Sequence, residues 1–184
     1  MTDENAPKNT DVPRTNGQSL SDSPASTLSK RAGQPPGEAT PSLQIIGQYL
    51  KDLSFENPKA PLSLSQNGKQ PQVEISVNVS ARIMGACDYE VNLQLSAKAN
   101  RDDDTVFGVE LVYAGLFRLR NTPQETVNPL LLIECPHMLF PFARQIMADA
   151  TRNGGFPPLL MDPVDFSKLY RESTSSNQAS HDSQ

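Results

Sequence analysis

The sequence predicts an α+β fold: a four-stranded antiparallel sheet followed by a long helix and a short C-terminal helix. Three observations carry this prediction. Long segments before residue 121 alternate apolar and polar residues with the period of a strand. After that point the apolar spacing changes to the period of a helix. A run rich in proline and glycine then separates the last two helical segments.

Four segments carry the strand pattern. Residues 43–55 have apolar residues at most odd positions, and Asn67-Gly68 predicts a turn in the loop that follows. Residues 73–83, 89–99 and 105–120 alternate more regularly and are joined by short turns, which favours an antiparallel meander with the first segment beside it. Residues 105–120 are also partly apolar on their second face, which favours a partner subunit.

The helical region begins after the last strand. Thr122-Pro-Gln-Glu125 has the composition of a capping box, which predicts a short helix that Cys135-Pro136 interrupts. A longer helix is expected over 136–153, with Pro141 making its early turns irregular or kinked. Its apolar face is expected to consist of Leu139, Phe142, Ala143, Ile146 and Ala150.

The end of the long helix is marked by glycine. Gly154-Gly155 predicts the helix stop, and residues 154–161 then form an extended apolar connector, because proline excludes helix and extends the residue before it. Asp162-Pro163 is expected to cap a last short helix over 162–170.

The two ends of the chain differ from the middle. Residues 1–42 and 173–184 are polar and rich in Ser, Thr, Asn and Pro, so they cannot bury enough apolar area to offset the entropy of ordering. We predict a disordered N-terminal arm, a folded domain over 43–172 and a disordered C-terminal tail.

Composition excludes several classes of function. The net charge of -5 and the absence of basic clusters argue against a nucleic-acid partner. The two cysteines lie far apart and form no CxxC, so neither a disulfide scaffold nor a zinc site is expected. The N-terminus has no apolar signal region and no segment is long and apolar enough to enter a membrane, so we predict a cytoplasmic protein.

No group of residues predicts catalysis. Asp102, Asp103 and Asp104 lie in an expected hairpin turn, where aspartates are ordinarily solvated. Cys135 and His137 are two positions apart at a helix start and would not face each other. We therefore predict that the protein is not an enzyme and uses no cofactor or metal.

An apolar surface is the remaining candidate. The side chains of the connector and the last helix either pack the long helix onto the sheet or line a groove, and both interpretations stay open on composition alone. The six residues concerned are Phe156, Leu159, Leu160, Met161, Phe166 and Tyr170.

These same segments resemble the SecB family of bacterial protein-export chaperones. The likeness lies in ECP-x-x-LFPFAR (134–144), GGFPPLLMDPVDF (154–166), the LY pair (169–170) and YLKDLSFENP (49–58). It runs in the same order over residues 43–172, and such a multi-segment string is more specific than one short motif.

The resemblance implies a function and an assembly. SecB-like proteins are cytosolic homotetramers, dimers of dimers with the long helix between the dimers, and they need no ATP. They hold unfolded precursor proteins in apolar grooves lined by the connector, the last helix and exposed sheet residues. This assigns the six apolar residues above to client binding. They deliver these clients to the SecA motor at the translocon.

The resemblance also assigns an acidic docking surface for SecA. Carried over by position, its residues are Asp52, Glu56 and Glu110. The position two before the last acid is often bulky and apolar in the family, whereas this chain has Gly108. That departure concerns the apolar part of the SecA contact and leaves the charges in place.

Two alternative functions follow from the same sequence. A chaperone of the same fold could serve one antitoxin of a toxin–antitoxin system. A small-molecule-binding or enzymatic α+β domain would instead need an enclosed pocket with convergent polar groups.

Overall fold

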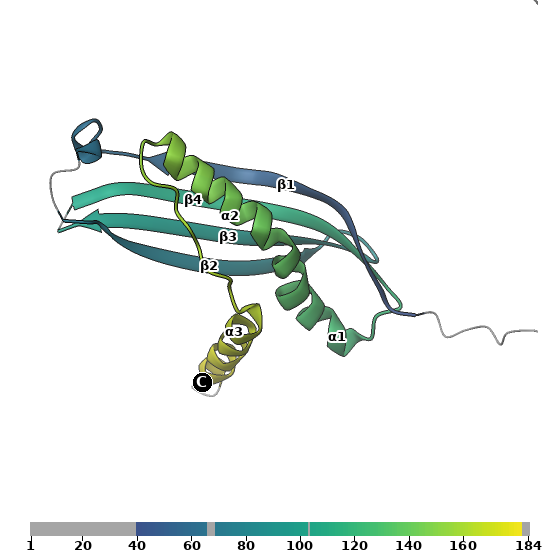
Figure 1. The fold of residues 1–184 in the computed structure, drawn as a ribbon. Coiled ribbons are helices and arrows are strands. Elements are labelled where there is room, and N and C mark those ends of the chain that lie inside the picture. The colour runs from purple at the N-terminus through teal and green to yellow at the C-terminus, as the bar shows by residue number, and fades with distance from the viewer. Residues whose placement is uncertain (1–39, 66–68, 103, 182–184) are drawn as a thin grey trace, which may run out of the picture. The chain divides into compact units, whose positions relative to one another are not determined.

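The computed structural model describes residues 40–65, 69–102 and 104–181, all within the second of two units into which the chain divides, Gly37–Gln184. The predicted Asn67-Gly68 turn and Asp103 lie outside these residues. The elements follow the predicted order (Figure 1). They are β1 (Ser42–Glu56), the 3-10 turn η1 (Leu62–Leu64), β2 (Gln72–Ile83), β3 (Asp88–Arg101), β4 (Asp104–Arg120), α1 (Gln124–Pro129), the π-helical turn η2 (Leu130–Glu134), α2 (Cys135–Asn153) and α3 (Phe166–His181).

The four strands form one antiparallel sheet in the order β1-β4-β3-β2, which confirms the predicted meander with the first strand beside it. Leu95 of β3 lies between Leu111 of β4 and Val77 of β2 in the register. Alternate residues of all four strands therefore share the face over which α2 runs (Figure 1).

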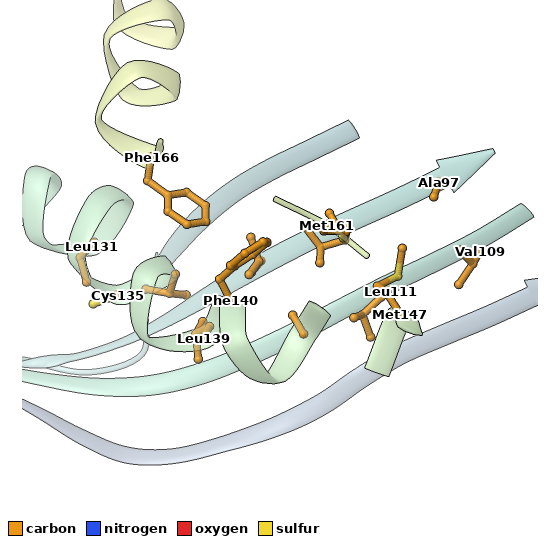
Figure 2. Packing of buried hydrophobic residues seen from close by; sticks show 14 of the residues in the cluster. Ala97, Val109, Leu111, Leu131, Cys135, Leu139, Phe140, Met147, Met161 and Phe166 are labelled. Atoms are coloured by element: carbon orange, nitrogen blue, oxygen red, sulfur yellow. The ribbon is translucent and has the colours of Figure 1, made fainter. Parts of the chain in front are cut away.

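The core lies between this face and α2. Most buried side chains of α2 recur every fourth residue, so they form a stripe along the helix that faces β3 and β4 (Figure 2), and Pro136 and Phe140 are buried beside it. Close approach at one point requires Gly115 of β4, because a Cβ there would lie 2.9 Å from Leu139 Cδ2. The stripe consists of Cys135, Leu139, Ala143, Met147 and Thr151.

This stripe corrects the predicted helix face. Leu139 and Ala143 belong to it, but Phe142 is 52% exposed. Phe142 instead stacks against Tyr113 of β4, with ring centroids 6.2 Å apart. The apolar residues of α2 cover more than one face, and packing against the sheet decides which of them is buried.

The start of the helical region also differs from the prediction. The helix begins at Gln124 with Pro123 at the N-cap and no side-chain cap, while the Thr122 hydroxyl donates to the Arg120 carbonyl over 3.3 Å. The capping-box interpretation is therefore wrong. Cys135-Pro136 does not interrupt the helical conformation either, because α1, η2 and α2 follow one another without a break.

The π-helical turn η2 supplies the physical reason. It occupies the turn directly before Pro136, where the missing N–H would break the regular hydrogen-bond ladder. The irregularity expected near Pro141 thus lies earlier, and α2 continues through Pro141.

The predicted glycine stop of α2 is confirmed. The N–H of Gly155 bonds to the Arg152 carbonyl over 3.0 Å and that of Phe156 to the Thr151 carbonyl over 3.1 Å, the paired bonds of a Schellman motif. Gly155 has φ +88°, a conformation that glycine adopts without strain.

The last helix begins later and ends later than predicted. The Asp165 carboxylate accepts the N–H of Lys168 over 2.9 Å, so Asp165, not Asp162, caps α3. The helix then continues to His181, past the boundary predicted at Ser173. The hydroxyls of Ser173 and Thr174 donate to the Tyr170 carbonyl over 2.8 and 3.0 Å, so polar side chains do not end the helix here.

Candidate functional site

The connector between α2 and α3 is held by one buried hydroxyl. Residues 157–165 have no regular secondary structure. Thr151 Oγ1 accepts the N–H of Leu159 over 2.9 Å, and the hydroxyl lies within hydrogen-bond distance of the carbonyls of Met147 (3.1 Å) and Ala148 (3.0 Å). Sequence reasoning missed this anchor, although a threonine on an otherwise apolar stripe was a usable signal.

Three aromatic rings fix the start of the connector. Phe107 of β4 lies 4.8 Å from Phe156 and 5.9 Å from Phe55 of β1, measured between ring centroids. Phe55 also covers Gly154, where an added Cβ would lie 2.1 Å from the ring. Gly154, at the end of α2, therefore also leaves room for the ring of Phe55, which packs the start of the connector against β1.

A hollow of about 580 Å³ opens beside these rings. It lies between the connector, the segment before β2 and the ends of β3 and β4. Leu160 projects at its edge and is 83% exposed. The apolar lining residues are Leu64, Pro71, Val73, Phe107, Phe156, Pro157, Pro158, Leu159 and Leu160.

A second hollow of about 270 Å³ lies farther along β2. Its walls are Val77 and Val79 of β2, Leu132 of η2, and Leu169 and Tyr170 of α3. The rest of the lining is polar and consists of Asn78, Glu172 and Ser173, so the sheet and the last helix face each other across a gap of mixed polarity.

The two hollows belong to one apolar row of β2. Val73 lies in the first and Val77 in the second, and Ile75 between them is 43% exposed. Helix α2 crosses the sheet over β4 and β3 (Figure 1). Val73 and Ile75 stay exposed, whereas Val77 and Val79 are half-buried against the core. We call the row and its two hollows the β2 groove. The sequence analysis expected sheet residues beside the groove but named none of them.

The six apolar residues predicted for client binding divide into two groups. Phe156, Leu159 and Leu160 line the larger hollow, and Tyr170 lines the smaller one. Met161 and Phe166 line neither hollow. They are 7% and 0% exposed and belong to the core (Figure 2).

The ring of Phe166 shows why it is core. It packs edge-on against Phe140, at 6.0 Å between centroids, and against His137, at 4.9 Å. Met161 and Phe166 therefore belong to the core, and Phe156 and Leu159 both pack against the core and line the larger hollow. Their role in client binding stays a prediction.

The three predicted docking acids share the opposite face of the sheet. Glu110 of β4 is paired with Ser54 of β1, so Asp52 and Glu56 lie diagonally on either side of it. All three are exposed, and none forms an ion pair with another described residue. The register thus brings together acids that the sequence separates by more than fifty positions.

Gly108 adjoins this acidic surface. It is paired with Glu56, and a Cβ added to it would meet nothing within 4 Å. The surface therefore has room for a larger side chain at this position.

A buried carboxylate organises the same face farther along the sheet. Glu90 of β3 accepts hydrogen bonds from Tyr49, from Lys51 (2.9 Å) and from Arg82 (2.6 Å). Burial alone would raise its pKa, but these three donors lower the pKa of Glu90 to about 2. The sequence did not reveal this link between β1, β2 and β3, because Tyr49 and Glu90 lie 41 positions apart.

The structure offers no activated nucleophile at Cys135. Burial raises the pKa of the Cys135 thiol to about 12, so the thiol stays protonated at neutral pH. Among the described residues, no three His, Cys, Asp or Glu side chains cluster as metal ligands. No described helix has the length and hydrophobicity needed to cross a membrane.

Comparisons with known proteins agree with this arrangement. The family model of preprotein translocase subunit SecB matches residues 36–177. A protein-export protein SecB from Afipia carboxidovorans is 58% identical over 134 residues, covering 73% of this chain and 83% of the relative. One from Rhodopseudomonas palustris is 54% identical over 140 residues, covering 76% and 89%.

A solved structure supports the fold. It is a SecB-like chaperone from Mycobacterium tuberculosis in complex with a peptide from an antitoxin. The TM-score is 0.56 at 16% identity, over 66% of this chain and 90% of the other.

Proposed function

We propose a function from the premise that the chain belongs to the SecB family of protein-export chaperones. The protein holds unfolded precursor polypeptides in the β2 groove, without ATP, and passes them to SecA. The observation that carries the proposal is the open apolar row of β2. An exposed apolar strip bordered by a rigid connector suits binding of extended, unfolded chains by apolar contact.

The cellular compartment and the mode of action are inferred from the same premise. We infer a cytoplasmic chaperone that works by binding and release, without catalysis and without a cofactor. The core position and protonated thiol of Cys135 support this inference.

Substitution of Leu160 tests client binding. Leu160→Asp places a charge at the edge of the larger hollow and should abolish suppression of aggregation of a denatured precursor. Leu62→Asp is the matched control, because Leu62 is also an exposed leucine but lies in η1 outside both hollows. Equal activity of both variants and the wild type would contradict the proposal.

Delivery to SecA is supported by the acidic surface of Asp52, Glu56 and Glu110. Exposed charges of one sign attract a cationic segment and make its binding sensitive to salt. Reversing all three to Lys should weaken SecA binding at least about tenfold, at about 0.5 kcal/mol for each exposed pair. Glu125→Lys, on α1, is the control, and client binding should survive in both variants.

We also propose a homotetramer, a dimer of dimers in which α2 lies between dimers. Exposed apolar side chains on the helix side of β1 and on α2 support it, since such a surface is unfavourable in water. They are Ile45, Leu50, Leu53, Met138 and Phe142. Light scattering of the full chain, giving four times the 20.1 kDa chain mass, would bear this out.

A second function rests on the structural neighbour. The Mycobacterium tuberculosis chaperone binds an antitoxin peptide, and the same fold here would accommodate one dedicated antitoxin client. The relatives above 50% identity are export proteins, and they favour the export function. A chaperone that bound one antitoxin and no denatured precursor would reverse this order.

A further inference from the structure

Lys51 is a cation directly beside the docking acids. The register of β1 on β4 passes from the pair Leu50–Tyr113 to the pair Asp52–Val112, so Lys51 is the extra residue of a β-bulge. In a regular strand successive side chains point to opposite faces of the sheet. At this bulge Lys51 and Asp52 both lie on the face opposite α2, which is the face that bears the docking acids.

The ammonium of Lys51 is nevertheless turned away from Asp52. Lys51 Nζ lies 2.9 Å from Glu90 Oε2 and 3.1 Å from Asn92 Oδ1, and both of these residues belong to β3. To reach them, the side chain crosses β4 near Ala114, which is fully buried although it faces away from α2. Asp52 forms no ion pair with any residue that the structure describes.

Glu90 is the stronger partner for this cation. With a pKa of about 2 it is ionised at neutral pH, so its negative charge is always present there. Glu90 is only 2% exposed, whereas Asp52 is exposed to solvent. An ion pair at a partly buried carboxylate is screened less by water and salt than an exposed pair. Lys51 therefore pairs with Glu90 and leaves the charge of Asp52 available.

We propose that Glu90 is a positioning residue for SecA docking, because it holds Lys51 away from Asp52 and so keeps the acidic surface free for a cationic segment of the partner. This inference rests on the proposed delivery to SecA and adds a residue that acts through Lys51. Without the carboxylate of Glu90, Lys51 would pair with its neighbour Asp52. The docking surface would then be partly neutralised by the protein's own side chain.

Substitution of Glu90 measures the effect. Glu90→Gln keeps the shape of the side chain and removes its charge, so the Kd of the full chain for SecA should rise about threefold at low salt, the size expected of one exposed ion pair. The difference from the wild type should shrink as salt is added, because exposed charges are screened. Isothermal titration calorimetry at several salt concentrations gives both results.

A second substitution separates this role from a structural one. Lys51→Met in the Glu90→Gln background removes the freed ammonium and keeps an apolar stem of similar length. The Kd should return to within about 1.5-fold of the wild-type value. If Glu90 only stabilised the sheet, the loss of a further member of its network would not restore binding.

Arg82 provides the matched control. It also pairs with Glu90, over 2.6 Å, but it belongs to β2, at the opposite edge of the sheet from β1 and Asp52. The double variant Glu90→Gln/Arg82→Gln has the same net charge as Glu90→Gln/Lys51→Met. It should nevertheless bind SecA as weakly as Glu90→Gln, whereas a general charge effect would restore both double variants equally.

Lys51→Met alone decides the matter if thermal unfolding shows that Glu90→Gln has lost its fold. In the otherwise wild-type protein the charge of Lys51 is already held by Glu90. Lys51→Met should therefore change the Kd for SecA no more than Arg82→Gln does. Binding about threefold tighter than in Arg82→Gln would show that Lys51 already neutralises Asp52.

The outcomes separate the two claims. An unchanged Kd in Glu90→Gln, or equal Kd values in the two double variants, overturns the role of Glu90 and leaves docking at the acidic surface standing. Failure of the wild-type protein to bind SecA overturns the proposed delivery itself.

Discussion

Strands β3 and β2 carry the same alternating apolar pattern on the same side of the sheet, yet their apolar rows have different surroundings. Leu93 and Leu95 of β3 are fully buried under α2. Ile75 of β2 is 43% exposed, although its register partner Ala97 belongs to the core. The difference shows that alternation predicts which face is apolar, whereas the path of the helix decides whether the residues of that face are buried or exposed.

The strongest test of this comparison is truncation of one residue from each row. Leu93→Ala should lower the free energy of unfolding by about 2–5 kcal/mol, because it leaves a cavity in a packed core. Ile75→Ala should cost less than about 1 kcal/mol, because much of that side chain is already in water. Urea denaturation of both variants measures the contrast. Equal losses would mean that the β2 row is core.

The junction between the two regions provides the next test. Gly154→Ala would place a Cβ 2.1 Å from the Phe55 ring, so it should destabilise the protein by about 1–3 kcal/mol and displace the connector. Gly108→Ala is the control, since its Cβ would meet nothing within 4 Å and its cost should be near zero. Thermal melts and client binding are the readouts. Unchanged client binding in Gly154→Ala would show that the connector needs no fixed position.

The smallest expected effect concerns the opposite face. Hydrogen bonds from Tyr49, Lys51 and Arg82 lower the pKa of Glu90 to about 2 from its ordinary value of 4.5. Its contribution to stability is therefore full above pH 4.5 and is lost as the pH falls toward 2. Glu90→Gln should cost about 1–2 kcal/mol at neutral pH and flatten the pH dependence of stability in that window.

A matched control on this face is Glu74→Gln, an exposed carboxylate of β2. It should leave both the stability and its pH dependence unchanged. If Glu90→Gln keeps the pH dependence of the wild type, the ionised Glu90 is not the group that links the strands.

Much of the fold was predictable because its signals are local. The period of two fixes the strands, and a glycine with positive φ is favoured where α2 ends. The start of α3 was less accessible, because Asp162 and Asp165 both look like caps. Only the observed bond from the Lys168 N–H to Asp165 separates them.

The candidate site was predictable in part. Leu160 and Met161 are neighbours on a proline-rich extended segment with no regular period, yet one projects into solvent and the other enters the core. That choice depends on α2 and the sheet, which no local pattern encodes. The network around Glu90 likewise depends on groups that only the folded sheet brings together.

One crosslinking experiment tests the central claim that the open β2 row binds clients. A photo-reactive amino acid is placed at Ile75, on the groove side of β2, and in a second protein at Ser76, which is also exposed but on the opposite face. Each protein is illuminated with an unfolded precursor. The account predicts strong crosslinks from position 75 and few from position 76. Equal crosslinking at both positions, or crosslinking from position 76 alone, would contradict it.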